Sequence, residues 1–229
     1  MASFAIICEG VSESNCLHAI VDKMGKSDGD FADIQPEMTQ NHGRVAQNSS
    51  GGWTEVLSHC NMETFQTALQ TNDYLIVQID TDRCHEPGFD VPKLDANNKP
   101  RSEADIYQDV INRILRDIEP AFFAANKDRI IFAICFDEIE CWFLPVFFVN
   151  DKKKACSTHN CIFHLNTALS KKNTGLGIPQ DKKNMPQVLK AYQYIFKQIK
   201  RKDIPDIASC NFGFDAFFNQ LCLIPDIEE

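Results

Sequence analysis

The sequence lacks any apolar run long enough to cross a lipid bilayer, which takes about 20 residues in a helix. The short apolar run from Phe4 to Cys8 follows no basic residue and ends in the acidic Glu9. It is therefore interpreted as a strand and not as a secretory signal. The sequence also contains no internal repeat and no long low-complexity tract. We therefore expect a globular protein of the cytoplasm without a membrane segment.

The ten cysteines do not form a regular disulfide pattern. Several lie inside apolar runs, where a free cysteine behaves as a small apolar residue; examples are Cys8, Cys135, Cys141 and Cys222. Because no secretory signal is recognised, we expect these cysteines to be reduced.

The net charge of −9 argues against nucleic-acid binding over the whole surface, but this charge is unevenly distributed. Residues 1–150 carry 11 basic and 24 acidic side chains, a net charge of −13, whereas residues 151–229 carry 12 basic and 8 acidic ones, a net charge of +4. The second part of the chain would suit contact with a polyanion. Alternatively, its lysines are simply solvated.

Apolar strand-like runs alternate with amphipathic helical patterns over the first two thirds of the chain. This alternation predicts an α/β fold with a mainly parallel, Rossmann-like sheet flanked by helices. Ser12 is expected to cap the first helix. The remainder has helical patterns alone, which predicts a helical C-terminal extension. The predicted strands are residues 2–8, 74–82 and 129–136, with a further short strand expected within 31–38. The predicted helices are 13–24, 53–70, 102–118, 162–170, 185–202 and 212–221.

Acidic residues follow three of the predicted strands. Glu9 follows the first strand, Asp80 and Asp82 end the second, and Glu138 and Glu140 follow the third. Parallel strands that alternate with helices bring these ends to one edge of the sheet. Crowded carboxylates repel one another unless a cation binds among them, and oxygen ligands suit a hard divalent ion. The pattern therefore predicts a Mg²⁺ or Mn²⁺ site.

Two of these segments resemble the TOPRIM family of topoisomerases, primases and OLD-type nucleases. They are Glu9-Gly10 after the first strand and Asp80-Thr81-Asp82 after a later one. A third segment, from Phe136 to Leu144, resembles the acid-x-x-x-Trp-Leu segment of small stand-alone TOPRIM proteins, which often occur in anti-phage loci. The resemblance covers residues 2–148. It implies a TOPRIM-like α/β domain at residues 1–148 and a basic, helical extension at residues 149–229 packed on it.

The resemblance implies a Mg²⁺-dependent nuclease that cleaves phosphodiester bonds of DNA or RNA as an anti-phage effector. Glu9, Asp80, Asp82 and Glu140 would be catalytic, and Glu9, Asp80, Asp82, Glu13 and Glu138 would bind metal. No tyrosine lies in a setting typical of a topoisomerase, and no Walker A loop is present, so an ATPase partner would be a separate chain. Alternatively, the chain is a non-catalytic regulatory subunit of a defence complex. Self-association into a homo-oligomer is left open.

Two clusters in the C-terminal part have alternative interpretations. Four lysines flank the glycines of residues 173–177 and would either bind a nucleic-acid backbone or belong to a solvated connector; they are Lys171, Lys172, Lys182 and Lys183. A second cluster contains zinc-ligand types at an unusual spacing, so it is either a zinc site or a surface loop running into a helix; it comprises Cys156, His159, Cys161 and His164.

Overall fold

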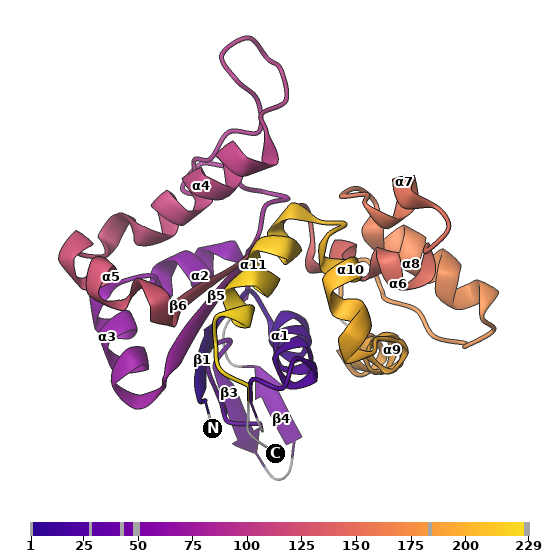
Figure 1. The fold of residues 1–229 in the computed structure, drawn as a ribbon, viewed down its shortest axis with the longest axis horizontal. Helices are drawn as coiled ribbons and strands as arrows, with labels where there is room; N and C mark the ends of the chain where they lie inside the picture. The colour runs from indigo at the N-terminus through magenta and orange to yellow at the C-terminus, as the bar shows by residue number, and fades with distance from the viewer. Residues whose placement is uncertain (1, 28, 42–43, 48–50, 183–184, 227–229) are drawn as a thin grey trace.

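The computed structural model describes residues 2–27, 29–41, 44–47, 51–182 and 185–226. Its central feature is a four-stranded sheet with the order β2-β1-β5-β6, in which every neighbouring pair is parallel. A separate antiparallel pair, β3 and β4, follows β2 (Figure 1). The strands are β1 (Phe4–Ile7), β2 (Phe31–Gln35), β3 (Met38–Asn41), β4 (Arg44–Gln47), β5 (Tyr74–Asp80) and β6 (Ile130–Cys135).

The strand order places a switch point at the carboxyl ends of β1 and β5. From β1 the chain passes first to β2 on one side and later to β5 on the other side. The connections leaving these two neighbouring strands therefore diverge, and open α/β sheets bind ligands at such a point. The residues that follow β1 and β5 are Cys8-Glu9 and Thr81-Asp82.

Helices cover both faces of the sheet because its strands are apolar on both sides. Along β1, Phe4 and Ile6 point into one core and Ala5 and Ile7 into the other, as the two-residue period requires. On one face lie α2 (Trp53–His59), α3 (Met62–Thr71), α4 (Glu103–Ile114) and α5 (Pro120–Asn126). On the other lie α1 (Val11–Lys23), the 3₁₀ helix η3 (Ile139–Phe143), α8 (Cys161–Lys171), α9 (Met185–Gln198), α10 (Ile204–Ala208) and α11 (Phe212–Cys222).

The C-terminal helices belong to the same core as α1 and one face of the sheet. Trp142 of η3 stacks on Phe214 of α11, with 4.5 Å between ring centroids. Helix α11 packs directly on β6. A Cβ atom built on Gly213 would lie 1.9 Å from the carbonyl oxygen of Ile134, so only glycine allows this approach. The predicted α/β fold with a parallel sheet and a helical C-terminal region is confirmed. The predicted division at residue 148 stays a prediction.

Several predicted helix boundaries are wrong. The helix predicted at residues 53–70 is two helices, because Asn61 caps a new helix by accepting a hydrogen bond from the amide of Thr64. The stretch before α8 contains the short helices α6 (Leu144–Phe147) and α7 (Lys152–Ala155). Short 3₁₀ helices also occur: η1 (Leu115–Asp117), η2 (Lys127–Arg129) and η4 (Arg201–Asp203).

The expectation that every cysteine is reduced is also wrong. Cys141 in η3 and Cys161 at the start of α8 form a disulfide. The two residues are 20 positions apart in the sequence, and the packing of α8 against η3 brings them together in the core. Within the described ranges, no helix is both long and apolar enough to span a bilayer.

Candidate functional site

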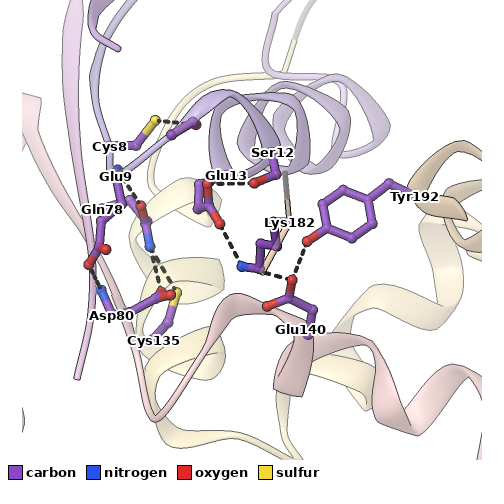
Figure 2. A network of polar contacts seen from close by, with 11 residues as sticks. Cys8, Glu9, Ser12, Glu13, Gln78, Asp80, Cys135, Glu140, Lys182 and Tyr192 are labelled. Carbon is purple, nitrogen blue, oxygen red and sulfur yellow. Dashed lines mark hydrogen bonds and ion pairs between the residues drawn. The ribbon is translucent and has the colours of Figure 1, made fainter. Parts of the chain in front are cut away.

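Three neighbouring strands deliver acidic side chains to one edge of the sheet. Glu9 lies two residues after β1, and Asp80 is the last residue of β5. Glu140 lies in η3, which follows β6 and packs against it. Glu13 comes from the first turn of α1. Figure 2 shows these four side chains gathered on the same side of the sheet, as the pattern of acid-ended strands predicts.

Gln78 connects the acids at the ends of β1 and β5. Its side-chain nitrogen donates to Oδ1 of Asp80 over 2.7 Å, and its side-chain oxygen accepts from the Glu9 amide over 3.1 Å. Glu9 Oε1 in turn accepts from the Asp80 amide at 2.8 Å. The two carboxylates are therefore held beside each other by a fully buried amide. A lone glutamine in the apolar strand Tyr74–Asp80 is a sequence signal that the prediction did not use.

Lys182 lies among the carboxylates and is the main departure from the predicted site. Its ammonium is 2.9 Å from Oε1 of Glu13 and 2.8 Å from Oε1 of Glu140 (Figure 2). Glu140 is fully buried and Glu13 nearly so. From the sequence, Lys182 is expected either to bind a nucleic-acid backbone or to lie in a solvated connector, yet its ammonium is the counter-ion of two buried acids. We call Glu13, Glu140 and Lys182 the lysine cluster.

The turn after β1 is shaped to present Glu13. A Cβ atom at Gly10 would lie 2.9 Å from Oε2 of Glu13, so a glycine leaves room for this carboxylate over the turn. The predicted cap at Ser12 is wrong, because α1 begins at Val11, two residues earlier than predicted, and its N-cap, Gly10, makes no side-chain bond. The Ser12 hydroxyl instead donates to Glu13 over 2.7 Å. Ser12 therefore supports the acid and not the end of the helix.

Tyr192 of α9 extends the lysine cluster into the core. Its hydroxyl donates to Oε1 of Glu140 in a short hydrogen bond. Burial and the charge of Glu140 raise the pKa of Tyr192 well above its usual range, so it remains a neutral donor. This buried tyrosine orients Glu140. The sequence does not distinguish Tyr192 from a core residue, because it falls in the apolar stripe of α9 with Val188, Ala191 and Ile195.

The surroundings of two of the acids raise their pKa values. Burial, together with the charges of Glu13 and Asp82, raises the pKa of Glu9 to about 8. Burial and the charge of Glu9 raise the pKa of Asp80 well above its usual range. Both shifts are in the direction expected when carboxylates outnumber the cations that face them. Glu9 and Asp80, at the ends of β1 and β5, therefore lack a compensating positive charge.

The lysine cluster shows the opposite balance. Burial alone would raise the pKa of Glu13, but the charge and hydrogen bond of Lys182, with the Ser12 hydroxyl, lower it below the usual value. Burial would likewise lower the pKa of Lys182, but Glu13, Glu140 and Asp80 raise it well above its usual range. Lys182 is therefore a permanent cation at neutral pH, and Glu13 is a permanent anion.

Asp82 and Glu138 are half-buried and lie at the rim of the group of acids at this edge of the sheet. β5 ends at Asp80, so the two-residue period of a strand does not place Asp82 beside it. Asp82 is half-buried in the following turn, where its amide donates to the Asp137 carbonyl over 3.2 Å. Its charge nevertheless contributes to the raised pKa of Glu9. Burial and the charge of Glu140 raise the pKa of the half-buried Glu138 to about 7.

The turns after β5 and β6 are joined to each other. The Thr81 amide donates to the Cys135 carbonyl at 2.9 Å, and the Thr81 hydroxyl accepts from the Asp137 amide at 3.1 Å. Asp137 has a φ of 65°, a left-handed conformation that is uncommon outside glycine and asparagine. These bonds fix the backbone that carries Asp82 and Glu138.

The acids at this edge carry oxygen atoms of the kind that a hard divalent cation binds, although the described residues contain no preformed group of three or more metal-binding side chains. Oε2 of Glu140 is buried, and no hydrogen-bond partner is found for it among the described residues. A buried carboxylate oxygen without a donor is costly, and a bound cation would satisfy it. Glu9 and Asp80 would contribute further oxygens, and Asp82 stands at the rim. Glu13 is already engaged by Lys182 and Ser12, so it is less available to a metal ion than its predicted role as a ligand requires.

The remaining predicted residues lie apart from the carboxylates or outside the described residues. Lys171 and Lys172 are exposed at the end of α8. Lys183 lies outside the described residues. In the zinc-like cluster, Cys161 is bonded to Cys141, so its sulfur is not available as a thiolate ligand.

Comparison of the chain with protein-family models, with curated protein sequences and with solved structures gives no match.

Proposed function

We propose that the chain is a Mg²⁺- or Mn²⁺-dependent nuclease of TOPRIM type, which acts in the cytoplasm on phosphodiester bonds of DNA or RNA. The observation that carries this proposal is that Glu9, Asp80 and Glu140 follow or end three neighbouring parallel strands at one edge of the sheet, where Oε2 of Glu140 is buried without a donor among the described residues. An anti-phage role, with an ATPase or another defence subunit as a separate partner, is part of the same proposal.

In this proposal Glu9, Asp80 and Glu140 hold the cation, with Asp82 at the rim. The bound ion would activate water and neutralise charge on the phosphate. Lys182 supplies a second positive charge at a place fixed by Glu13 and Glu140. In this proposal the ammonium takes the place that a second metal ion has in a two-metal mechanism. Glu9, whose pKa is about 8 in the metal-free chain, also suits proton transfer near neutral pH.

Cleavage assays with matched variants test the proposal. The purified chain is incubated with plasmid, single-stranded DNA and tRNA in Mg²⁺ or Mn²⁺. We expect cleavage that falls at least about 100-fold in Glu9→Gln and Asp80→Asn, because several kcal/mol of charge stabilisation are lost. Asp128→Asn is the control, since this exposed carboxylate precedes the amino end of β6, whereas the candidate site lies beyond the carboxyl ends of the strands. Cleavage that persists in Glu9→Gln and Asp80→Asn would show that the site assignment is wrong.

The contact of Lys182 with two acids also favours a second function, that of a non-catalytic regulatory subunit. A cluster that carries its own cation can be stable without metal, and Gln78 already engages Asp80. Such a subunit would act only with its partner. Calorimetric titration of Mn²⁺ separates the two functions. Stoichiometric binding that is lost in Asp80→Asn supports the nuclease, whereas no binding up to millimolar Mn²⁺ supports the regulatory subunit.

A further inference from the structure

A second feature, away from the carboxylates, is the surface formed by the end of α6 together with α7 and α8. It carries Phe163, which is 66% exposed and is one of few large apolar side chains so exposed among the described residues. Figure 1 shows α7 and α8 at the side of the molecule remote from α3 and α5. Phe163 therefore does not contribute to the core, and its ring is open to contact from outside the molecule.

Phe163 belongs to a continuous row of rings and cations. Its ring centroid is 5.6 Å from that of His164, which is 6.3 Å from that of Phe148. The ammonium of Lys154 lies 5.7 Å from the centre of the Phe148 ring. We call these four side chains the aromatic row. Phe148 and His164 are half-buried, so packing holds the row in place while Phe163 presents its ring to solvent.

The surroundings of the aromatic row are basic. Residues 148–172 contain five lysines and one aspartate, in a chain whose net charge is −9. The aspartate, Asp151, lies 3.4 Å from the ammonium of Lys154 and partly offsets it. Lys152 and Lys153 are exposed on α7, and two more lysines are exposed at the end of α8. The surface is therefore positively charged against a negative molecule, which suits a polyanionic partner.

We propose that the aromatic row binds single-stranded nucleic acid. An exposed ring can stack on an unpaired base, while lysines beside it meet the phosphates. Bases within a duplex are already stacked and paired, so the same surface would favour single strands. An acidic peptide would match the charge, but it would leave the ring of Phe163 without a planar partner.

This binding surface is attached to the candidate site by the disulfide. Cys161 begins α8, and its partner Cys141 directly follows Glu140. The helix that carries Phe163 is therefore covalently fixed to the segment that carries a site acid. The inference rests on the proposed function in one respect, because it deepens that function by naming single strands as the substrate, bound at a surface away from the carboxylates and joined to their segment by the disulfide.

Binding measured without metal tests the aromatic row independently of cleavage. Fluorescein-labelled oligothymidylate and oligouridylate of about 12 nucleotides are titrated with the full chain in EDTA, and anisotropy is recorded. We expect Phe163→Ala to weaken binding about 5- to 150-fold, the range for loss of one stacked base. Phe163→Trp should restore binding. Leu223→Ala is the control, because this residue is 83% exposed after α11, outside the row.

Two further measurements complete the test. Replacing Lys152 and Lys153 by Gln should reduce the dependence of affinity on salt concentration. A blunt duplex of the same length should bind more weakly than either single strand. Equal affinity of Phe163→Ala and the unaltered chain, or equal affinity for duplex and single strand, would overturn the inference. If the unaltered chain binds single strands but does not cleave them, that result counts against the proposed function and not against the aromatic row.

Discussion

Replacing Lys182 by Met tests the central feature of the candidate site. Methionine keeps most of the side-chain length but removes the ammonium that contacts Glu13 and Glu140. The two acids would then be buried next to each other without a cation, since Glu140 is fully buried and the Glu13 side chain is 6% exposed. We expect the variant to be clearly less stable than the unaltered chain at pH 7.

The size of this effect follows from the burial of the partners. Removing one member of a buried ion pair costs about 3–5 kcal/mol, because the remaining charge is left unpaired. The lower end applies here, since the Lys182 side chain is 20% exposed and water can partly replace it. For a chain of this length, a loss of about 3 kcal/mol lowers the thermal midpoint by about 6–12 °C.

The effect should depend on pH in a defined direction. In the unaltered chain the folded pKa of Glu13 is lowered. Its contribution to stability is therefore present above the unfolded carboxyl pKa, about 4.3, and is lost as pH falls through the folded value. In Lys182→Met this contribution is absent, and burial without the ammonium raises the pKa of Glu13 above its unfolded value, so the penalty in the variant is relieved as Glu13 is protonated with falling pH. The difference in stability between the two proteins should therefore shrink as pH falls from 7 to 4.

Thermal unfolding followed by circular dichroism between pH 4 and 8 provides the measurement. Lys190→Met is the matched control, because Lys190 is exposed on α9 and its replacement should change the midpoint little. An unchanged midpoint for Lys182→Met at pH 7 would refute the placement of its ammonium between the two acids. A pH-independent loss would show that lost packing, and not lost charge, caused the effect.

Two further predictions concern metal binding and the packing of α11. Because the pKa of Glu9 is about 8, the affinity for Mg²⁺ should rise between pH 6 and pH 9, and binding should release fewer protons at the higher pH. Calorimetry in two buffers measures the affinity and the number of protons released. An affinity that does not change with pH would contradict the involvement of Glu9. Gly213→Ala should destabilise the fold by at least about 1–3 kcal/mol, because the added Cβ would meet a carbonyl of β6. Gly177→Ala is the control and should not destabilise the fold, because the atom nearest to its added Cβ is 3.6 Å away. Equal denaturation midpoints for the two variants would refute the close contact at Gly213.

The sheet and its acid-bearing edge could be predicted because local rules decide them. Apolar β-branched runs predict buried parallel strands, and parallel strands bring their carboxyl ends together whatever the details of the loops. Glu9, Asp80 and Glu140 therefore lie where the sequence predicted. The helix boundaries were less predictable, since one capping side chain, such as Asn61, outweighs an amphipathic pattern that runs on past it.

The disulfide between Cys141 and Cys161 could not be predicted from spacing. It depends on α8 packing against η3, which is a property of the tertiary structure. An apolar setting is equally compatible with a free buried thiol, as five other cysteines show, so composition alone could not distinguish the two states.

Lys182 shows why an acidic pattern does not by itself predict how many metal ions a site binds. Crowded buried carboxylates require compensating charge, and a metal ion or a lysine from a distant segment can supply it. The sequence separates Lys182 from Glu13 by 169 residues, and nothing near it distinguishes it from the exposed lysines of the same connector. Its ammonium is paired with Glu13 and with one oxygen of Glu140, whereas the pKa values of Glu9 and Asp80 remain raised. The remaining deficit of positive charge lies at the strand ends, and that is where we expect a single metal ion to bind.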